Sequence, residues 1–226
     1  NILNGYGTTE SFWNSFLRPY DLPDNAGSVG GSCIDDEVRV VKVYKDRKAE
    51  PDELVDTDGE SVGEIIISSP GKTTYSYYNN DEEQEHKFYK GWMYTGDLGV
   101  WDRNLYITIK GRKDDMIVCS GENIYPAQIE EALSEFDKIE DSMVVPVPDK
   151  MRGQAVAAYV VPKDKSLSVA QLADFCNKSP MLSTYKRPRW YRIVDSLPMT
   201  ATGKKMHYAM KQQAAEDMKK GLLKRR

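Results

Sequence analysis

The sequence predicts an α+β fold, with an antiparallel, strand-rich first half followed by a small domain of mixed strands and helices. Three observations predict it. Short β-branched and aromatic runs, separated by turns of Gly, Pro, Asp and Asn, dominate residues 20–110. Helix-start signals followed by helically spaced apolar residues gather beyond residue 125. The charge balance also changes: residues 1–100 carry 9 Lys+Arg and 19 Asp+Glu, whereas residues 101–226 carry 22 and 16. Composition alone leaves two interpretations of the basic half, a surface that meets phosphates and a solvated surface of mixed charge.

The totals are those of an ordinary globular protein. A chain of 226 residues suggests one or two domains. No apolar run approaches the roughly 20 residues of a membrane helix, and no signal peptide is visible, so we expect no membrane span. The three cysteines are scattered, with no CxxC pair or Cys/His cluster, which favours reduced thiols and a cytoplasmic location over a disulfide framework or a zinc site. The chain opens on Asn1 rather than Met, and we expect a fragment of a longer protein.

The first half reads as strands joined by polar turns. Residues 1–10 look like a strand end that enters a polar turn, and the glycine-rich segment 27–32 lacks the Gly-Lys-Ser/Thr ending of a phosphate-binding loop, so we interpret it as a plain turn. A short helix with an acidic first turn is expected at 81–85. The expected strands are 38–43, 62–67, 92–98 and, after a hairpin turn, 105–109.

Residues 111–131 connect the two halves and begin the second. They comprise a charged segment, a short strand at 116–119 and a helix that starts with Pro126, where the missing N–H is harmless. Ser168 and Gln171 form a capping box for a second helix. We expect one sheet with helices packed on it, a loop at 196–205, and a last helix from Met206 that frays into a basic tail. The remaining expected strands are 143–147, 155–161 and 191–194.

Five motifs occur in a fixed order: YGTTE at 6–10, YTGD at 94–97, GRKDD at 111–115, SGENIYPAQIEEAL at 120–133 and PMTATGK at 198–204. Together they resemble the adenylate-forming superfamily of acyl-CoA synthetases, adenylation domains and luciferases. The resemblance covers nearly the whole chain and only the later part of the family pattern. It implies that residues 1–111 are a distorted, barrel-like β remnant of a large AMP-binding domain. Residues 112–226 would be the C-terminal lid domain, with a hinge near Asp114.

The resemblance also implies a reaction. A small-molecule carboxylic acid attacks the α-phosphorus of ATP in the presence of Mg²⁺, giving acyl-AMP and pyrophosphate, and the thiol of CoA then displaces AMP. We therefore expect an AMP-forming acyl- or aryl-CoA ligase of fatty-acid or aromatic-acid metabolism, with no nucleic-acid partner. Because the upstream phosphate loop of the family is not in this chain, we expect the 226 residues to be inactive alone.

Site residues of the first half follow from the motifs. Tyr6 resembles the aromatic residue that stacks on adenine, and Thr9 would bind phosphate. Glu10 resembles a catalytic Mg²⁺ ligand, since Mg²⁺ prefers carboxylate and phosphate oxygens. Asp97 would accept the ribose hydroxyls, and Arg112 would reach the same ribose from the other domain. The residues alone leave simpler interpretations open: core packing for Tyr6, a helix-start charge for Glu10 and a surface ion pair for Arg112.

Site residues of the second half centre on Lys204. By resemblance it is the catalytic and nucleotide-binding lysine that bridges the acyl carboxylate and the phosphate as charge develops. Asp114 would be the hinge, and Ser120 with Gly121 would line the path of the CoA pantetheine arm, where a missing side chain leaves room. His207 stands where the family often has Arg, and we expect it, like His86, to be a surface residue. Related lysines can be acetylated, which makes a lysine acetyltransferase acting on Lys204 a candidate partner.

Other functions remain open on the sequence. The chain could be a non-catalytic nucleotide- or CoA-binding fragment, or an adenylation domain that loads the thiol of a carrier protein. The run SGENIYPAQIEE stands where carrier-loading domains usually have an RxxRIE-like stretch, which favours a free-standing CoA ligase. Luciferase-like monooxygenation is a further alternative within the superfamily.

Overall fold

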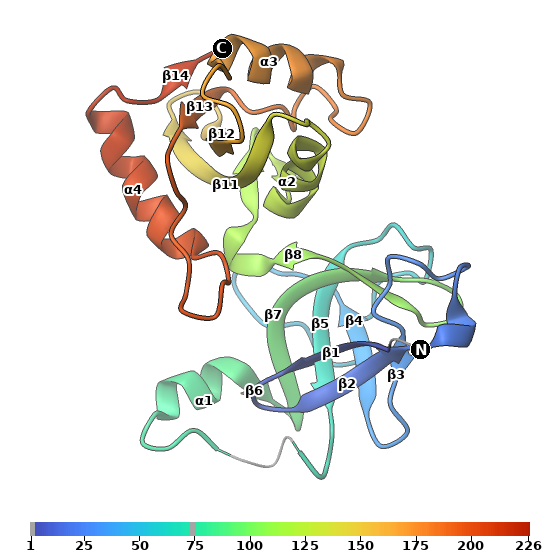
Figure 1. Cartoon of the computed structure of the whole chain (residues 1–226). Coiled ribbons are helices and arrows are strands. Elements are labelled where there is room, and N and C mark those ends of the chain that lie inside the picture. The colour runs from blue at the N-terminus through green and yellow to red at the C-terminus, as the bar shows by residue number, and fades with distance from the viewer. Residues whose placement is uncertain (1–2, 73–75) are drawn as a thin grey trace. The chain divides into compact units, whose positions relative to one another are not determined.

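The computed structural model describes residues 3–72 and 76–226, and the chain divides into two units, Asn1–Lys113 and Asp114–Arg226 (Figure 1). The predicted α+β class is confirmed, because nearly every strand pair is antiparallel and helices pack in both units. Arg112 and Lys113 lie in the first unit rather than in the second. No helix of the described ranges is long and apolar enough to cross a membrane.

The first unit contains two open, antiparallel sheets. The three-stranded sheet has the order β1-β2-β3, and the five-stranded sheet has the order β4-β5-β7-β6 with β8 paired to β7. The glycine-rich segment predicted as a turn runs through turns into β3. The elements are β1 (Asn4–Thr8), β2 (Phe12–Leu17), a 3₁₀ turn (Pro19–Asp21), β3 (Gly31–Ser32), β4 (Glu37–Val41), β5 (Gly63–Ser68), α1 (Asp81–Lys87), β6 (Phe88–Tyr89), β7 (Trp92–Trp101) and β8 (Ile107–Arg112).

The central strand β5 explains why the five-stranded sheet is stable. Its three consecutive isoleucines are fully buried, and successive side chains of a strand point to opposite faces. Ile65 and Ile67 pack in one apolar cluster with residues of β4 and β7, whereas Ile66 packs on the other face with Tyr94. Both faces of this strand are therefore covered.

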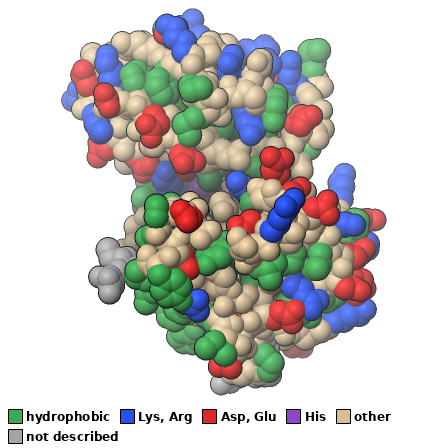
Figure 2. Space-filling view, turned by 90° about the vertical axis from the view of Figure 1, so that its right-hand side faces the viewer, with side chains coloured by type: hydrophobic (Ala, Val, Ile, Leu, Met, Phe, Trp, Pro, Cys, Tyr) green, Lys and Arg blue, Asp and Glu red, His purple; other side chains and the backbone are tan. Residues whose placement is uncertain are grey.

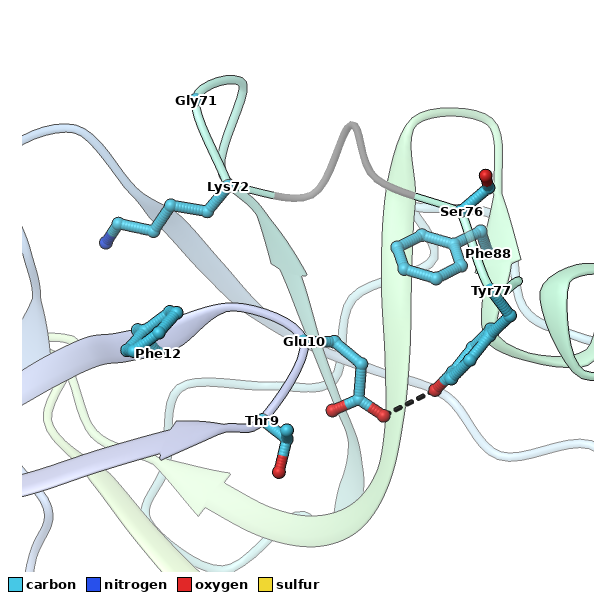
Figure 3. A pocket seen from close by; sticks show the side chains of 8 residues that line it. All are labelled: Thr9, Glu10, Phe12, Gly71, Lys72, Ser76, Tyr77 and Phe88. Carbon is cyan, nitrogen blue, oxygen red and sulfur yellow. Dashed lines mark hydrogen bonds between the residues drawn. The ribbon is translucent and has the colours of Figure 1, made fainter.

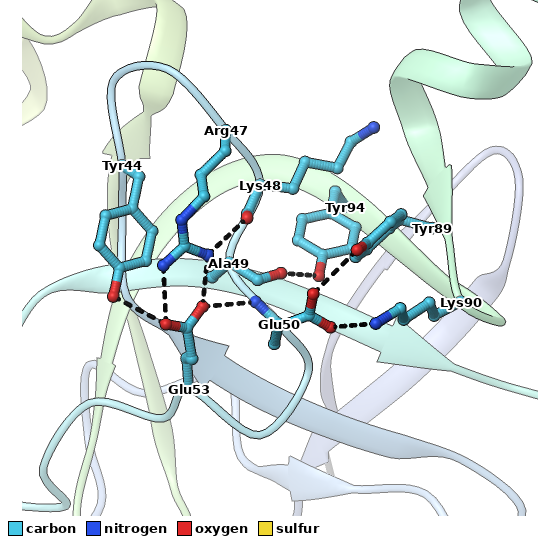
Figure 4. A network of polar contacts seen from close by, with 9 residues as sticks. All are labelled: Tyr44, Arg47, Lys48, Ala49, Glu50, Glu53, Tyr89, Lys90 and Tyr94. Atoms are coloured by element: carbon cyan, nitrogen blue, oxygen red, sulfur yellow. Dashed lines mark hydrogen bonds and ion pairs between the residues drawn. The ribbon is translucent and has the colours of Figure 1, made fainter.

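The loop between β4 and β5 supplies part of that cover. Figure 4 shows it fastened to β6 and β7 by tyrosines and ion pairs. Tyr94 donates a hydrogen bond to the carbonyl of Ala49, Tyr89 donates to Glu50 over 2.9 Å, and Lys90 pairs with Glu50 at 2.7 Å. These contacts cross from the loop to strands about 40 residues further along the chain, so they define how the loop folds back.

The second unit is one six-stranded sheet covered on both faces. Its order is β10-β9-β12-β13-β14, with β11 paired to β12, and only β12 and β13 run parallel. Helices α2 and α3 pack on one face and α4 packs on the other. The elements are a 3₁₀ turn (Lys113–Asp115), β9 (Ile117–Cys119), β10 (Glu122–Ile124), α2 (Pro126–Ser134), β11 (Ile139–Asp149), β12 (Gly153–Pro162), α3 (Val169–Lys178), β13 (Trp190–Ile193), α4 (His207–Lys219) and β14 (Lys224–Arg225).

The helix termini of this unit follow the sequence in one place and depart from it in another. The capping box of Ser168 and Gln171 is confirmed at the start of α3. The prediction that the last helix frays into a tail is wrong, because α4 ends at Lys219 and the chain returns as β14 beside β13. Gly221, with φ of 67°, turns the chain, and buried Leu223 anchors it in the core under α4.

Charge is mixed over the surface of this unit. Figure 2 shows Lys and Arg interspersed with Asp and Glu on the face that it presents, rather than gathered into one basic patch. Several charges of this unit are paired, including Lys205 with Asp141 and Lys211 with Asp115. The basic balance of the second half therefore does not by itself mark a phosphate site on this face.

Candidate functional site

Three predicted residues meet in the first unit. The register of β7 and β8 places Asp97 directly opposite Arg112, and Tyr6 approaches from β1. The Tyr6 hydroxyl donates to Asp97 Oδ2 over 2.7 Å, and Arg112 Nη1 donates to Asp97 Oδ1 over 2.8 Å. A Cβ on Gly96 would lie 3.2 Å from Arg112 Nη2, so the glycine leaves room for the guanidinium against the strand. Arg112 thus reaches Asp97 from the neighbouring strand, and not from the second unit as expected.

The three residues of this cluster become progressively more exposed from Tyr6 through Asp97 to Arg112. Tyr6 is 8% exposed and packs in the core, while the side chain of Asp97 is 14% exposed and that of Arg112 is 45% exposed. Burial, together with the negative charge of Asp97 and the hydrogen bond to it, raises the pKa of Tyr6 far above its usual value, so the hydroxyl stays a donor. The core packing that the sequence left open for Tyr6 is therefore real. Stacking on adenine remains a prediction.

Thr9 and Glu10 lie in the turn after β1, at a cavity of about 420 Å³ (Figure 3). The Tyr77 hydroxyl donates to Glu10 Oε1 across 67 residues of sequence. Burial pushes the pKa of Glu10 upward, but hydrogen bonds from Tyr77, from its own backbone and from Thr8 outweigh it and hold the pKa below its usual value. Glu10 is therefore an ionised carboxylate at neutral pH. The cavity is lined by Thr9, Glu10, Phe12, Gly71, Lys72, Ser76, Tyr77 and Phe88.

This donor set fits Mg²⁺ only in part. A single ionised carboxylate suits a hard cation that also takes phosphate oxygens. Among the residues that the structure describes, no group of three or more His, Cys, Asp or Glu could hold a metal by itself. Glu10 would therefore share the ion with a phosphate. Lys72 lines the same cavity, but its ammonium pairs with buried Asp36 at 2.7 Å.

The loop that carries Lys204 is closed by its own backbone. Thr200 donates its N–H to the Lys204 carbonyl over 2.8 Å, and Met206 donates to the Pro198 carbonyl over 2.9 Å. Gly203 takes a φ of 79° at the tip. Lys204 is exposed, and its amine forms no hydrogen bond or ion pair with any residue that the structure describes.

Lys205 and His207, which follow Lys204 by one and three residues, are held firmly. Lys205 binds Asp141 at 2.8 Å, Glu130 at 3.2 Å and the Ser142 carbonyl at 2.5 Å. His207 Nε2 lies 2.9 Å from Glu130 Oε1, with its side chain 20% exposed. His207 is therefore partly buried against Glu130 rather than a plain surface residue as expected, whereas His86 is exposed. Nothing in the sequence around Glu130 marked it as the common partner.

The Ser120–Gly121 pair forms the turn of a hairpin between β9 and β10. Both residues have positive φ, 54° and 89°, which matches a two-residue hairpin turn. A Cβ on Gly121 would meet no atom of the chain within 4 Å, so the turn faces open space. The Ser120 N–H donates to the Arg152 carbonyl over 3.1 Å, which sets the cationic turn between β11 and β12 beside it.

Asp114 opens the second unit within the 3₁₀ turn. Lys211 of α4 donates to the Asp114 carbonyl and pairs with Asp115 at 2.8 Å. These contacts fasten the first residues of the unit to α4, whose first residue is His207. The structure thus groups the predicted residues of each half separately. The first unit holds the Tyr6–Asp97–Arg112 cluster, and the second holds a lysine loop, a glycine turn and a charged opening segment.

Comparison with known proteins gives consistent matches. Residues 128–204 match the family of the AMP-binding enzyme C-terminal domain. The chain is 31% identical over 218 residues to the long-chain-fatty-acid–CoA ligase of Escherichia coli (strain CFT073), covering 94% of this chain and 36% of the ligase. It is 33% identical over 205 residues to the 2-succinylbenzoate–CoA ligase of Enterococcus faecalis, covering 90% and 39%.

Solved structures agree. The o-succinylbenzoate CoA synthetase of Bacillus subtilis, in complex with its acyl-adenylate intermediate, superposes with a TM-score of 0.79 and 30% identity. That match covers 92% of this chain and 40% of the synthetase. An anthranilate CoA ligase bound to anthranoyl-AMP gives a TM-score of 0.80 at 28% identity. The chain therefore spans well under half the length of these proteins.

Proposed function

The chain belongs to the adenylate-forming enzymes, and from this premise we propose that it is the lysine-bearing part of an AMP-forming acyl- or aryl-CoA ligase. In the first step a carboxylate oxygen attacks the α-phosphorus of ATP and pyrophosphate leaves. In the second step the CoA sulfur attacks the acyl carbonyl, AMP leaves, and the thiol proton is released. The observation that carries the proposal is Lys204, an exposed, unpaired cation (among the described residues) on a loop whose flanks are fixed.

The nucleotide would be held by the cluster of the first unit. An ionised carboxylate has acceptor sites beyond the two already used, so Asp97 is suited to the ribose hydroxyls. Arg112, half exposed, would donate to the same ribose, and Tyr6 would present Asp97 and contact the adenine. Thr9 would bind a phosphate oxygen, and Glu10 would share Mg²⁺ with the phosphates. The bound Mg²⁺ would offset the negative charge of the phosphates, and Thr9 and Glu10 would orient the phosphates and the metal.

Lys204 would act on developing charge. When the carboxylate attacks, negative charge is shared between the carboxylate and the α-phosphate, and a cation placed between them stabilises the transition state more than the ground state. An exposed lysine on a closed loop is suited to this work because its position is defined while its amine stays available. We propose further that acetylation of Lys204 by a lysine acetyltransferase would remove that charge and stop the first step.

The thiol step would use the hairpin turn. Gly121 has no side chain and faces open space, so the pantetheine arm would pass it unobstructed. Lys150 and Arg152, in the adjacent turn between β11 and β12, would meet the phosphates of CoA. Asp114, at the start of the second unit, would be the hinge. Rotation there after adenylation would carry Lys204 away from the acyl-adenylate and bring the Ser120–Gly121 turn to it for thioester formation.

The test is carboxylate-dependent exchange of pyrophosphate into ATP. We expect exchange, with a panel of fatty and aromatic acids, from a longer protein that contains this chain, and none from the 226 residues alone. The second expectation follows because the chain spans only 36% to 40% of the relatives. Two outcomes would contradict the proposed ligase function: pyrophosphate exchange that occurs without a carboxylic acid, and the absence of exchange from the longer protein with every acid of the panel. Nucleotide and CoA binding without exchange would favour the non-catalytic alternative. Carboxylate-dependent exchange with transfer only to a carrier protein, and not to CoA, would favour the carrier-loading one.

A further inference from the structure

Glu130 lies at the base of the Lys204 loop and contacts both Lys205 and His207. It projects from α2, with its side chain only 13% exposed. Oε2 accepts from Lys205 over 3.2 Å, and Oε1 lies 2.9 Å from His207 Nε2. One carboxylate thus links the end of the loop, through Lys205, to the first residue of α4.

The same contacts fasten the loop to the sheet. Strand β11 pairs only with β12 among the described strands, so its other edge needs partners. The Val144 N–H donates to Glu130 Oε1 over 2.8 Å, and the Ser142 carbonyl accepts from Lys205 over 2.5 Å. Helix α2, the edge of β11 and the Lys204 loop therefore meet at this carboxylate.

We propose that Glu130 is a positioning residue, which by binding Lys205 and protonated His207 fixes where the loop presents Lys204 and makes that placement depend on pH. This inference rests on the proposed function for its meaning, since Lys204 matters only if it is the lysine of adenylation. The structural part of the inference is that the loop is anchored by Glu130 and loosens when the charge of Glu130 is removed. This can be measured without an activity assay.

The charges around His207 decide the direction of the pH effect. Glu130 faces it from α2 and Asp115 from the 3₁₀ turn, while Lys205 lies on the loop with Asp141 of β11 beyond it, and Lys211 of α4 is bound to Asp115. The hydrogen bond to Glu130 raises the pKa of His207 above its usual value, although burial acts against it; Asp115 adds to the rise and Lys205 opposes it.

The sign follows from that direction. A histidine whose pKa is raised on folding contributes its stabilising ion pair fully below the unfolded pKa of about 6.5. The contribution is lost as pH rises through the higher, folded pKa. The anchor should therefore be strongest in mildly acidic solution and weaken above neutrality, while the Lys205 contacts keep the loop partly held.

The first measurement is hydrogen exchange of the loop amides in the 226-residue chain. The Thr200 and Met206 amides report the loop because both donate within it. After correction for the intrinsic pH dependence, we expect protection to fall as pH rises through the His207 titration. Glu130→Gln keeps an acceptor for Val144 but removes the charge, and should lower protection by about tenfold, the effect of losing a charge-assisted hydrogen bond.

Two further variants make the result specific. His207→Arg keeps the positive charge at all pH values, so it should retain protection and abolish the pH dependence. Glu216→Gln is the matched control: it removes the same charge from an exposed pair with Lys220 on α4 and should change nothing. NMR titration of His207 adds a direct readout, because its pKa should drop in Glu130→Gln.

In the longer protein, Glu130→Gln should lower pyrophosphate exchange while sparing thioester formation from supplied acyl-AMP. Unchanged loop protection in Glu130→Gln, or a His207 pKa that does not respond, would overturn the inference. Equal loss of both half-reactions would also overturn it, as the mark of a general fold defect. Absence of exchange in the unaltered protein would instead count against the ligase, and the loop measurements would still decide the anchor.

Discussion

The Tyr6–Asp97–Arg112 cluster and the Lys204 loop present their functional groups in opposite ways. In the cluster, each polar tip is bonded to another, with both Asp97 oxygens engaged at 2.7 and 2.8 Å. In the loop, the Lys204 amine has no partner among the described residues, whereas its neighbour Lys205 has three.

The difference separates two ways of building a site. In the cluster, Asp97 and Arg112 are prearranged on adjacent strands, where register fixes them, and Tyr6 bonds to Asp97 from the other sheet, as suits residues proposed to hold a ligand in place. In the loop, Lys204, which is proposed to act in one step only, is left unpaired by the described residues, and the ion pairs are made by Lys205 beside it. Removing a group from the loop should therefore affect one chemical step, whereas removing a group from the cluster should affect nucleotide binding throughout.

The largest effect is expected for Lys204→Ala. Removal of a preorganised donor to developing charge lowers a rate by about 10²- to 10³-fold. In the longer protein we expect that loss in pyrophosphate exchange, with thioester formation from supplied acyl-AMP retained. Lys165→Ala, which alters an exposed lysine of another loop in the same unit, is the control. A similar fall in both half-reactions would show that the loop is not specialised as proposed.

Asp97→Asn should come next. It keeps the shape of the side chain but weakens the bond to Arg112 and the acceptance of ribose hydroxyls. Because hydrogen bonds to charged groups contribute about 1.5–3 kcal/mol, ATP affinity should fall by roughly tenfold to a hundredfold in calorimetric titration of the longer protein. Asp24→Asn, on an exposed turn of the same unit, should leave affinity unchanged. A normal affinity in Asp97→Asn would remove the cluster from the nucleotide site.

Gly121→Ala should have a smaller effect, and it should act on thioester formation rather than on adenylation, the step that Lys204→Ala impairs. At φ of 89° any Cβ strains the backbone, with a cost of about 1 kcal/mol or more in stability. We expect slower thioester formation with adenylation retained. Gly221→Ala, at φ of 67° in the same unit, carries comparable strain away from the turn and should lower the melting temperature without affecting either step. If Gly121→Ala slowed adenylation but not thioester formation, this would argue against a CoA path at this turn.

How far the sequence predicts this molecule depends on the range of the interactions. Local patterns were sufficient for the isoleucine-rich strand β5 and for the capping box at Ser168, because both are decided by neighbours in sequence. The β14 strand was missed, since Lys224 and Arg225 carry no strand signal and are held by pairing with β13.

The candidate site shows the same limit. Motifs identified Asp97 and Glu10 as residue types suited to the chemistry, but their tyrosine partners lie far along the chain, and Tyr6 reaches Asp97 across 91 residues. Glu10 meets Tyr77 across 67 residues, and Glu130 meets His207 across 77. A charged residue on an amphipathic helix looks the same whether it faces solvent or anchors a distant loop, so only the folded chain distinguishes them.

The smallest effect is expected for Tyr6→Phe, which keeps the ring and removes the hydroxyl that orients Asp97. The hydroxyl would act on the nucleotide only through the orientation of Asp97, so only part of the roughly 1.5–3 kcal/mol of a hydrogen bond to a charged group should appear in binding. ATP affinity should therefore fall by about fivefold, less than in Asp97→Asn. Burial keeps the hydroxyl protonated, so this contribution should be constant between neutral and mildly alkaline pH.

The double variant decides how Tyr6 acts. If its hydroxyl works only through Asp97, Tyr6→Phe combined with Asp97→Asn should bind ATP no more weakly than Asp97→Asn alone, because coupled residues are not additive. Full additivity in calorimetric titration would mean that the hydroxyl contacts the nucleotide itself. If Tyr6→Phe lowered ATP affinity as much as Asp97→Asn does, the cluster would depend on the buried Tyr6 hydroxyl as much as on the charge of Asp97. The hydrogen bonds within the cluster would then be what holds Asp97 in place.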